Sequence, residues 1–98
     1  MAILSDIKIK NVTAASAITT DGVPGILLHV LFCGATAGDR LEILDGTTQR
    51  VNLLIPANNG SIEYNPPIGQ EPRFTTDIDA GVTAASKGYA TFIYREIT

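Results

Sequence analysis

The sequence has few of the residue types on which most enzyme and cofactor sites depend. Its 98 residues include no tryptophan, one cysteine, one histidine and one methionine. A single cysteine, Cys33, excludes a disulfide within the chain and a zinc site built from several cysteines. Charged residues make up only 17% of the chain, and a net charge of −3 argues against binding to nucleic acid or to an anionic membrane surface. We therefore expect neither nucleic acid nor a membrane among the partners of this protein.

Long apolar runs are also missing. The longest, Val23 to Cys33, is interrupted by Pro24, Gly25 and His29. It falls far short of the ~20 residues that a membrane-spanning helix needs. The initial run MAIL has no basic region before it and is soon followed by Asp6, which is not the pattern of a secretory signal peptide. We expect the chain to be made and kept in the cytosol, or to leave it with something larger.

The sequence is rich in short segments of β-strand character. Nine glycines and five prolines separate apolar runs at intervals of ~8–12 residues, which is typical of an all-β sandwich or barrel, and no segment carries a convincing helical period. We predict a single domain over residues 1–98, an antiparallel β-sandwich with Greek-key or jelly-roll-like connections. About seven strands are expected: Asp6–Val12, Ile26–Cys33, Arg40–Asp45, Arg50–Ile55, Ser61–Asn65, Arg73–Ala80 and Tyr89–Arg95.

Local patterns add three expectations about the connections. Asp45-Gly46 is a strong signal for a tight hairpin between two strands. The segment Ile26–Cys33 is almost entirely apolar, which predicts a central strand or one buried on both faces. Pro66-Pro67 forms a rigid extended link, and we expect it to carry the chain from one sheet to the other.

Two residues capable of chemistry lie in the most apolar strand. His29 would need a nucleophile or further ligands beside it to act in catalysis or metal binding. Cys33 is four residues away, about 13 Å along an extended strand, so the two side chains do not touch. We expect a half-buried histidine with one hydrogen bond, and a cysteine that acts as a small buried apolar residue. No catalytic residue is assigned.

Asp77 and Asp79 form a pair of carboxylates at i and i+2. On one face of a strand they would lie ~6.5–7 Å apart and could frame a calcium ion if a loop supplied carbonyl groups. The ordinary explanation is a solvent-facing side of a strand. The sequence leaves open whether the pair binds a cation, and no cofactor or resident metal is expected.

Six short segments together resemble a known family. In order they are Gly22–His29 (GVPGILLH), Arg40–Thr48 (RLEILDGTT), Val51–Pro56 (VNLLIP), Gly60–Ile68 (GSIEYNPPI), Arg73–Ile78 (RFTTDI) and Ala90–Arg95 (ATFIYR). This succession, over residues 22–95, resembles small virion structural proteins of tailed bacteriophages, including cyanophages. The chain departs from that pattern at Asp77, where the family often has glycine, and at Gln70-Glu71-Pro72, which stand as an insertion before Arg73.

The resemblance implies a protein without enzymatic activity. The proteins of that family look like capsid decoration (cement) proteins or small head and tail accessory proteins. The first of these implies a place on the capsid surface of a virion after synthesis in the host cytoplasm. The implied partners are the major capsid protein and a further copy of the chain, in a homodimer or homotrimer. Residues 1–5 form a possible docking arm, unless they fold back on their own domain. With one apolar sheet face they give the candidate docking residues Met1, Ile3, Leu4, Ile7 and Ile9.

Two other functions remain open. The first is a carbohydrate-binding or host-recognition module on the virion, which would use the loops Ala35–Asp39, Ala57–Gly60 and Gly81–Gly88. The absence of tryptophan, a common platform for sugars, counts against it. The second is a small enzyme in which His29 works with an acidic partner.

Overall fold

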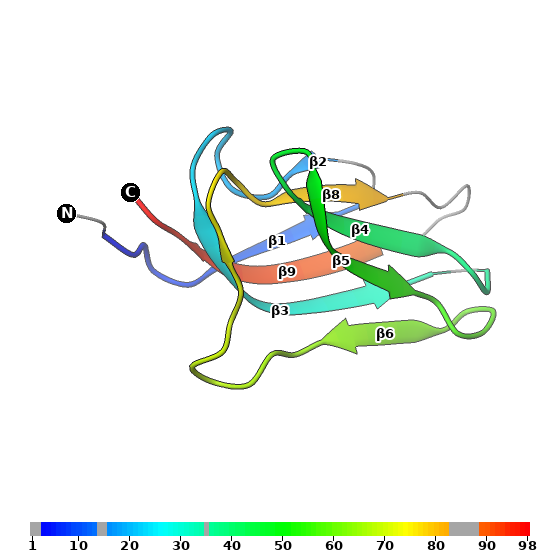
Figure 1. The fold of residues 1–98 in the computed structure, drawn as a ribbon. Coiled ribbons are helices and arrows are strands. Elements are labelled where there is room, and N and C mark those ends of the chain that lie inside the picture. Colours follow the sequence, from blue (N-terminus) through cyan, green and yellow to red (C-terminus); the bar gives the residue numbers. More distant parts are fainter. Residues whose placement is uncertain (1–2, 14–15, 35, 83–88) are drawn as a thin grey trace.

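The structure consists of β-strands arranged in two layers (Figure 1). It is a computed structural model that describes residues 3–13, 16–34, 36–82 and 89–98. Within these residues there is no helix, and nine strands are present: β1 (Lys8–Val12), β2 (Ser16–Ala17), β3 (Gly25–Cys33), β4 (Arg40–Asp45), β5 (Thr48–Leu54), β6 (Ser61–Tyr64), β7 (Arg73–Phe74), β8 (Asp79–Val82) and β9 (Tyr89–Glu96).

The strands form two antiparallel sheets. The first sheet has the order β1-β9-β3-β6, and β7 also pairs with β3; the second has the order β2-β8-β4-β5. The prediction of an all-β antiparallel sandwich is therefore confirmed. Because β1 pairs with β9, the two ends of the chain lie on the same side of the molecule (Figure 1).

The core fills the space between the sheets. Alternation along each strand turns every second side chain inward, so β3 contributes Phe32, β9 contributes Phe92, and β4 contributes Leu41 and Ile43. These side chains are fully buried, as is Phe74 of β7. Burying a side chain of this kind stabilises the fold by roughly 1.5–3 kcal/mol, so each of these five positions contributes substantially to stability.

The hairpin predicted at Asp45-Gly46 is confirmed. β4 and β5 pair from Asp45 and Thr48 onward, which leaves a two-residue loop of Gly46 and Thr47. Gly46 has a φ of 63°. A first loop residue with positive φ gives a turn whose twist matches that of the paired strands, and glycine adopts this conformation without strain.

The single strand predicted over Arg73–Ala80 is wrong. It is divided into β7, which pairs with β3 in the first sheet, and β8, which pairs with β4 in the second. Residues 75–78 cross between the layers, and Phe74 and Ile78 enter the core at the two ends of this crossing. This division and the short strand β2, which lies outside the seven predicted strands, explain why nine strands are found instead of about seven.

The expectation that Pro66-Pro67 carries the chain between sheets is also wrong. β6 and β7 both pair with β3, so residues 65–72 leave the first sheet and return to it. The prolines end β6 because they lack a backbone donor. A turn then reverses the chain, with Gln70 N donating to Pro67 O and Gly69 at a φ of 87°.

Candidate docking surface

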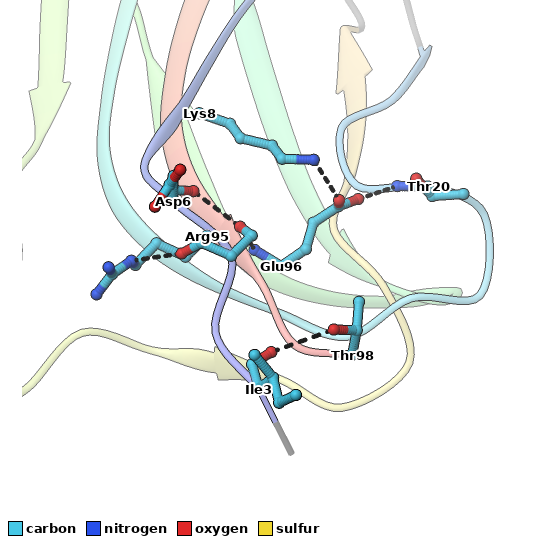
Figure 2. A network of polar contacts seen from close by, with 8 residues as sticks. Ile3, Asp6, Lys8, Thr20, Arg95, Glu96 and Thr98 are labelled. Atoms are coloured by element: carbon cyan, nitrogen blue, oxygen red, sulfur yellow. Dashed lines mark hydrogen bonds and ion pairs between the residues drawn. The ribbon is translucent and has the colours of Figure 1, made fainter. Parts of the chain in front are cut away.

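The N-terminal segment is fixed along the edge of its own domain. Ile3 and Thr98 exchange two backbone hydrogen bonds, of 2.7 and 2.8 Å, and Leu4 forms a β-bridge with Ile97. Ser5 N donates to Glu96 O at 2.8 Å. Of the two alternatives left open by the sequence, the described residues 3–5 therefore follow the one in which the segment folds back on its own domain (Figure 2).

The side chains of this segment nevertheless point to solvent. The exposed fractions are 61% for Ile3, 45% for Leu4, 59% for Ile7 and 67% for Ile9. They are four of the seven exposed large hydrophobic side chains among the described residues. Ile3, Leu4, Ile7 and Ile9 are here called the N-terminal apolar strip. The remaining candidate, Met1, lies outside the described residues.

Ile7 and Ile9 face outward because the lysines that alternate with them bind on the other side of β1. Lys8 Nζ lies 2.7 Å from Glu96 Oε1, and Lys10 Nζ donates to Ala17 O at 2.7 Å. Since neighbouring side chains on a strand point to opposite faces, two lysines held at the inner rim place Ile7 and Ile9 on the outer side.

Glu96 joins three parts of the chain at this edge. Its buried carboxylate accepts from Lys8 Nζ and, at 2.6 Å, from Thr20 N in the loop that follows β2 (Figure 2). The hydrogen bond from Lys8 and the amide of Thr20 hold the pKa of Glu96 below its usual value, and the same ion pair raises the pKa of Lys8. The sequence reasoning missed Glu96, although its alternation with the inward-facing Phe92 and Tyr94 was a usable signal.

His29 lies on the outer face of the first sheet. It is partly exposed, and its Nε2 forms a hydrogen bond of 3.5 Å with Glu63 Oε2, so the expected half-buried histidine with one hydrogen bond is confirmed. An acidic neighbour, as the enzyme alternative requires, is thus present. On the neighbouring strand β9, Ile93 lies directly opposite His29.

Cys33 lies on the same outer face, opposite Tyr89. It is partly exposed, so the expectation of a buried residue is wrong. A hydrogen bond to the Cys33 side chain raises the pKa of the Tyr89 hydroxyl.

Asp77 and Asp79 do not form a solvent-facing pair, because Asp77 is buried at the crossing between the sheets. Its two carboxylate oxygens accept from Gly22 N at 3.2 Å and from Gly46 N at 3.0 Å. Burial, and then a hydrogen bond with Asp77, raises the pKa of Asp79 to about 6. Asp77 therefore holds two turns against the crossing segment. No group of three or more His, Cys, Asp or Glu side chains in the described part of the chain is placed to hold a metal ion.

Two of the three loops of the carbohydrate-binding alternative are adjacent. Ala37 N donates to Asn58 Oδ1 at 2.9 Å, and Gly34 N donates to Gly60 O at 3.0 Å. Residues 35 and 83–88 of the predicted loop surface lie outside the described residues.

Comparison with known proteins finds none that is significantly similar to this chain. No protein-family model matches the chain, and neither the curated proteins nor the solved structures contain a significant match to it. Across the described ranges, no helix is long and apolar enough to cross a membrane.

Proposed function

We propose that this protein is a non-enzymatic structural protein of a phage virion, which decorates the capsid surface and stabilises the shell. It is made in the host cytoplasm, binds the major capsid protein, and associates with further copies of itself. The proposed docking surface rests on one observation, the N-terminal apolar strip. Its side chains are exposed, while the backbone of Ile3 and Ser5 is hydrogen-bonded to the C-terminal strand segment of the same domain. The class of protein rests on the resemblance described above.

A strip of this kind suits adhesion to a large neighbour. Apolar side chains on an exposed sheet edge are a common mark of a partner surface. Because the backbone of residues 3–5 is already hydrogen-bonded, little conformational entropy is lost when a partner covers the side chains. Covering three half-exposed side chains of the strip, Ile3, Leu4 and Ile7, would contribute on the order of 2–5 kcal/mol at each docking site.

Decoration then stabilises the shell by mass action. A protein that binds the assembled capsid and not its separated subunits adds its binding free energy to the assembled state. A shell filled with DNA is under internal pressure, so many copies that each bind weakly across capsomer junctions together oppose its opening.

The test adds the purified protein to particles that lack it and images where density appears. Ile3→Ser/Leu4→Ser is expected to lower occupancy of the shell, because these two side chains are exposed and their backbone bonds remain. Leu54→Ser, which changes an exposed side chain of β5 in the other sheet, serves as the matched control. Equal occupancy by the strip variant and the control would contradict the proposed docking surface.

A further inference from the structure

The first sheet is apolar on both faces along its central strand, while the second sheet covers only one of them. On β3, the inward-facing Leu27, Val30 and Phe32 are fully buried. The outer positions of this strand are also mostly apolar and are only partly buried: Ile26, Leu28, Leu31 and Cys33. Strands with apolar residues on both faces are typical of sheets that are covered on both sides. A further layer is therefore expected over this outer face.

The strand register arranges the outer face in rows across the sheet. The middle row contains Ile9, Ile93 and His29. The row on one side of it contains Leu31, Thr91, Asn11 and Glu63. The row on the other side contains Ile26, Arg95 and Arg73. Apolar side chains thus occupy the centre, and charged ones stand toward the sides.

The two charges beside β3 are of opposite sign and are placed symmetrically. β6 and β7 follow each other along the same edge of β3, so Glu63 and Arg73 lie on one side of the sheet, on either side of the middle row. Both side chains are exposed. Arg95 is engaged elsewhere, because its Nε donates to Ser5 O at 3.0 Å.

A two-fold axis along the middle row would exploit this arrangement. It exchanges the two flanking rows, so that Glu63 meets Arg73 of the partner subunit and Ile93 meets Ile93 of the partner subunit. The same contact is made twice, as a closed symmetric dimer requires. Two sheets that pack face to face keep their strands within about 30° of each other, which leaves both charge pairs within reach.

The size of the face also fits a second copy. Four strands about 4.8 Å apart and a central strand of nine residues give a face of roughly 19 by 30 Å. That is about a tenth of the total surface of 5465 Å², close to the share that a standard protein–protein interface takes from a small protein.

We propose that the outer face of the first sheet packs face to face on the same face of a second copy of this chain, with the two-fold axis along the row of Ile9, Ile93 and His29. This inference deepens the self-association in the proposed function, and it assigns Ile9 of the N-terminal apolar strip to the dimer, which leaves Ile3, Leu4 and Ile7 for the capsid. Its test is separate, because dimerisation is measured on purified protein without particles and does not use the Ile3 and Leu4 variants.

The experiment is sedimentation velocity from about 10 to about 500 µM, a range suited to an interface at the low end of the standard size. The wild-type protein should reach twice the 10.4 kDa of one chain. Ile93→Glu should weaken the dimer at least tenfold, because it places two carboxylates on the axis. Leu54→Glu, the same kind of change on the other sheet, should not.

Charge reversal tests the orientation and does not alter the core. Glu63→Arg and Arg73→Glu should each weaken the dimer at least tenfold, since each brings like charges together. The double variant should restore association to within about threefold of the wild type. A monomer throughout the concentration range, a dimer that Ile93→Glu leaves intact, or a double variant without rescue would overturn the proposal.

Discussion

Asp45 and Asp77 each bind the backbone of the segment that carries the other. Asp45 accepts from Thr76 N at 2.8 Å and from Thr75 N at 3.0 Å, and Asp77 accepts from Gly46 N at 3.0 Å. Burial alone would raise the pKa of Asp45, but the hydrogen bonds from Thr75 and Thr76 outweigh it and lower the pKa. This reciprocal clasp fixes the β4–β5 hairpin to the segment that crosses between the sheets.

Replacing Asp77 should destabilise the fold through unpaired amides. In Asp77→Ala the N–H groups of Gly22 and Gly46 lose their acceptor, and because both hydrogen bonds are only partly buried, each loss costs about 1 kcal/mol. We expect a total loss of about 1–3 kcal/mol in urea unfolding. A double-mutant cycle with Asp45→Ala should show a coupling of at least ~0.5 kcal/mol, and strictly additive losses would argue against a shared clasp.

Asp79→Asn should make the protein more stable at neutral pH. The pKa of Asp79 rises from 3.8 to about 6 on folding, so the folded state binds the proton more tightly. The stabilisation from that proton is complete below pH 3.8 and is lost as the pH rises to 6. An asparagine donates to Asp77 at every pH, and we expect a gain of about 1 kcal/mol at pH 7 after allowing for solvent screening.

The measurement is the free energy of unfolding between pH 4 and pH 7. The wild type should show a decline attributable to Asp79, and the variant should lack it. Parallel curves for the two proteins would show that this carboxyl does not change its proton affinity on folding.

Lys8→Met should weaken the edge that holds the N-terminal apolar strip. The pKa of Glu96 lies below its usual 4.5, so its stabilising contribution is present above pH 4.5 and is lost as the pH falls through the lower folded value. Removing the cation leaves a buried carboxylate held by the backbone and side chain of Thr20. We expect a measurable loss of stability at pH 7, smaller than for a fully buried pair because Lys8 is partly exposed.

Acid titration checks this assignment. In Lys8→Met the acid-induced loss of stability below pH 4.5 should become smaller. Lys10→Met, which removes a lysine that binds a carbonyl instead, should leave that loss unchanged. Equal effects of the two substitutions would place the acid sensitivity outside the Lys8–Glu96 pair.

The hairpin loop should discriminate among residues at position 46. Gly46 has positive φ, so Gly46→Val should cost at least ~1–2 kcal/mol, because a β-branched side chain is strained in this conformation. Gly46→Asn should cost only a few tenths of a kcal/mol, since asparagine tolerates positive φ. Thermal unfolding compares the two, and similar losses would mean that backbone conformation is not the limiting factor.

The sequence predicted what local patterns encode. The spacing of glycine and proline indicated an all-β sandwich, and Asp45-Gly46 located the hairpin. The crossing at residues 75–78 was hidden because the alternation from Phe74 to Ile78 continues through it. The break depends on Asp45 and Gly46, which lie some thirty residues earlier in the chain.

The same limit of local sequence patterns applies to the candidate docking residues. The alternation of Ile7 and Ile9 with Lys8 and Lys10 in the sequence places the two pairs on opposite faces of a strand, but it does not tell which pair faces inward. That outcome depends on Glu96, 88 residues from Lys8. The row of Ile9, Ile93 and His29 likewise joins three strands whose register no local pattern contains.

The position of β9 has a consequence for synthesis. This strand lies between β1 and β3, so the first sheet lacks its middle until residues 89–96 have left the ribosome. Until that moment β1 has no neighbouring strand in its sheet, and the edge of β3 that pairs with β9 has no partner. A nascent chain in this state exposes the surfaces that chaperones bind, and closure of the fold waits for its most distant contacts in sequence.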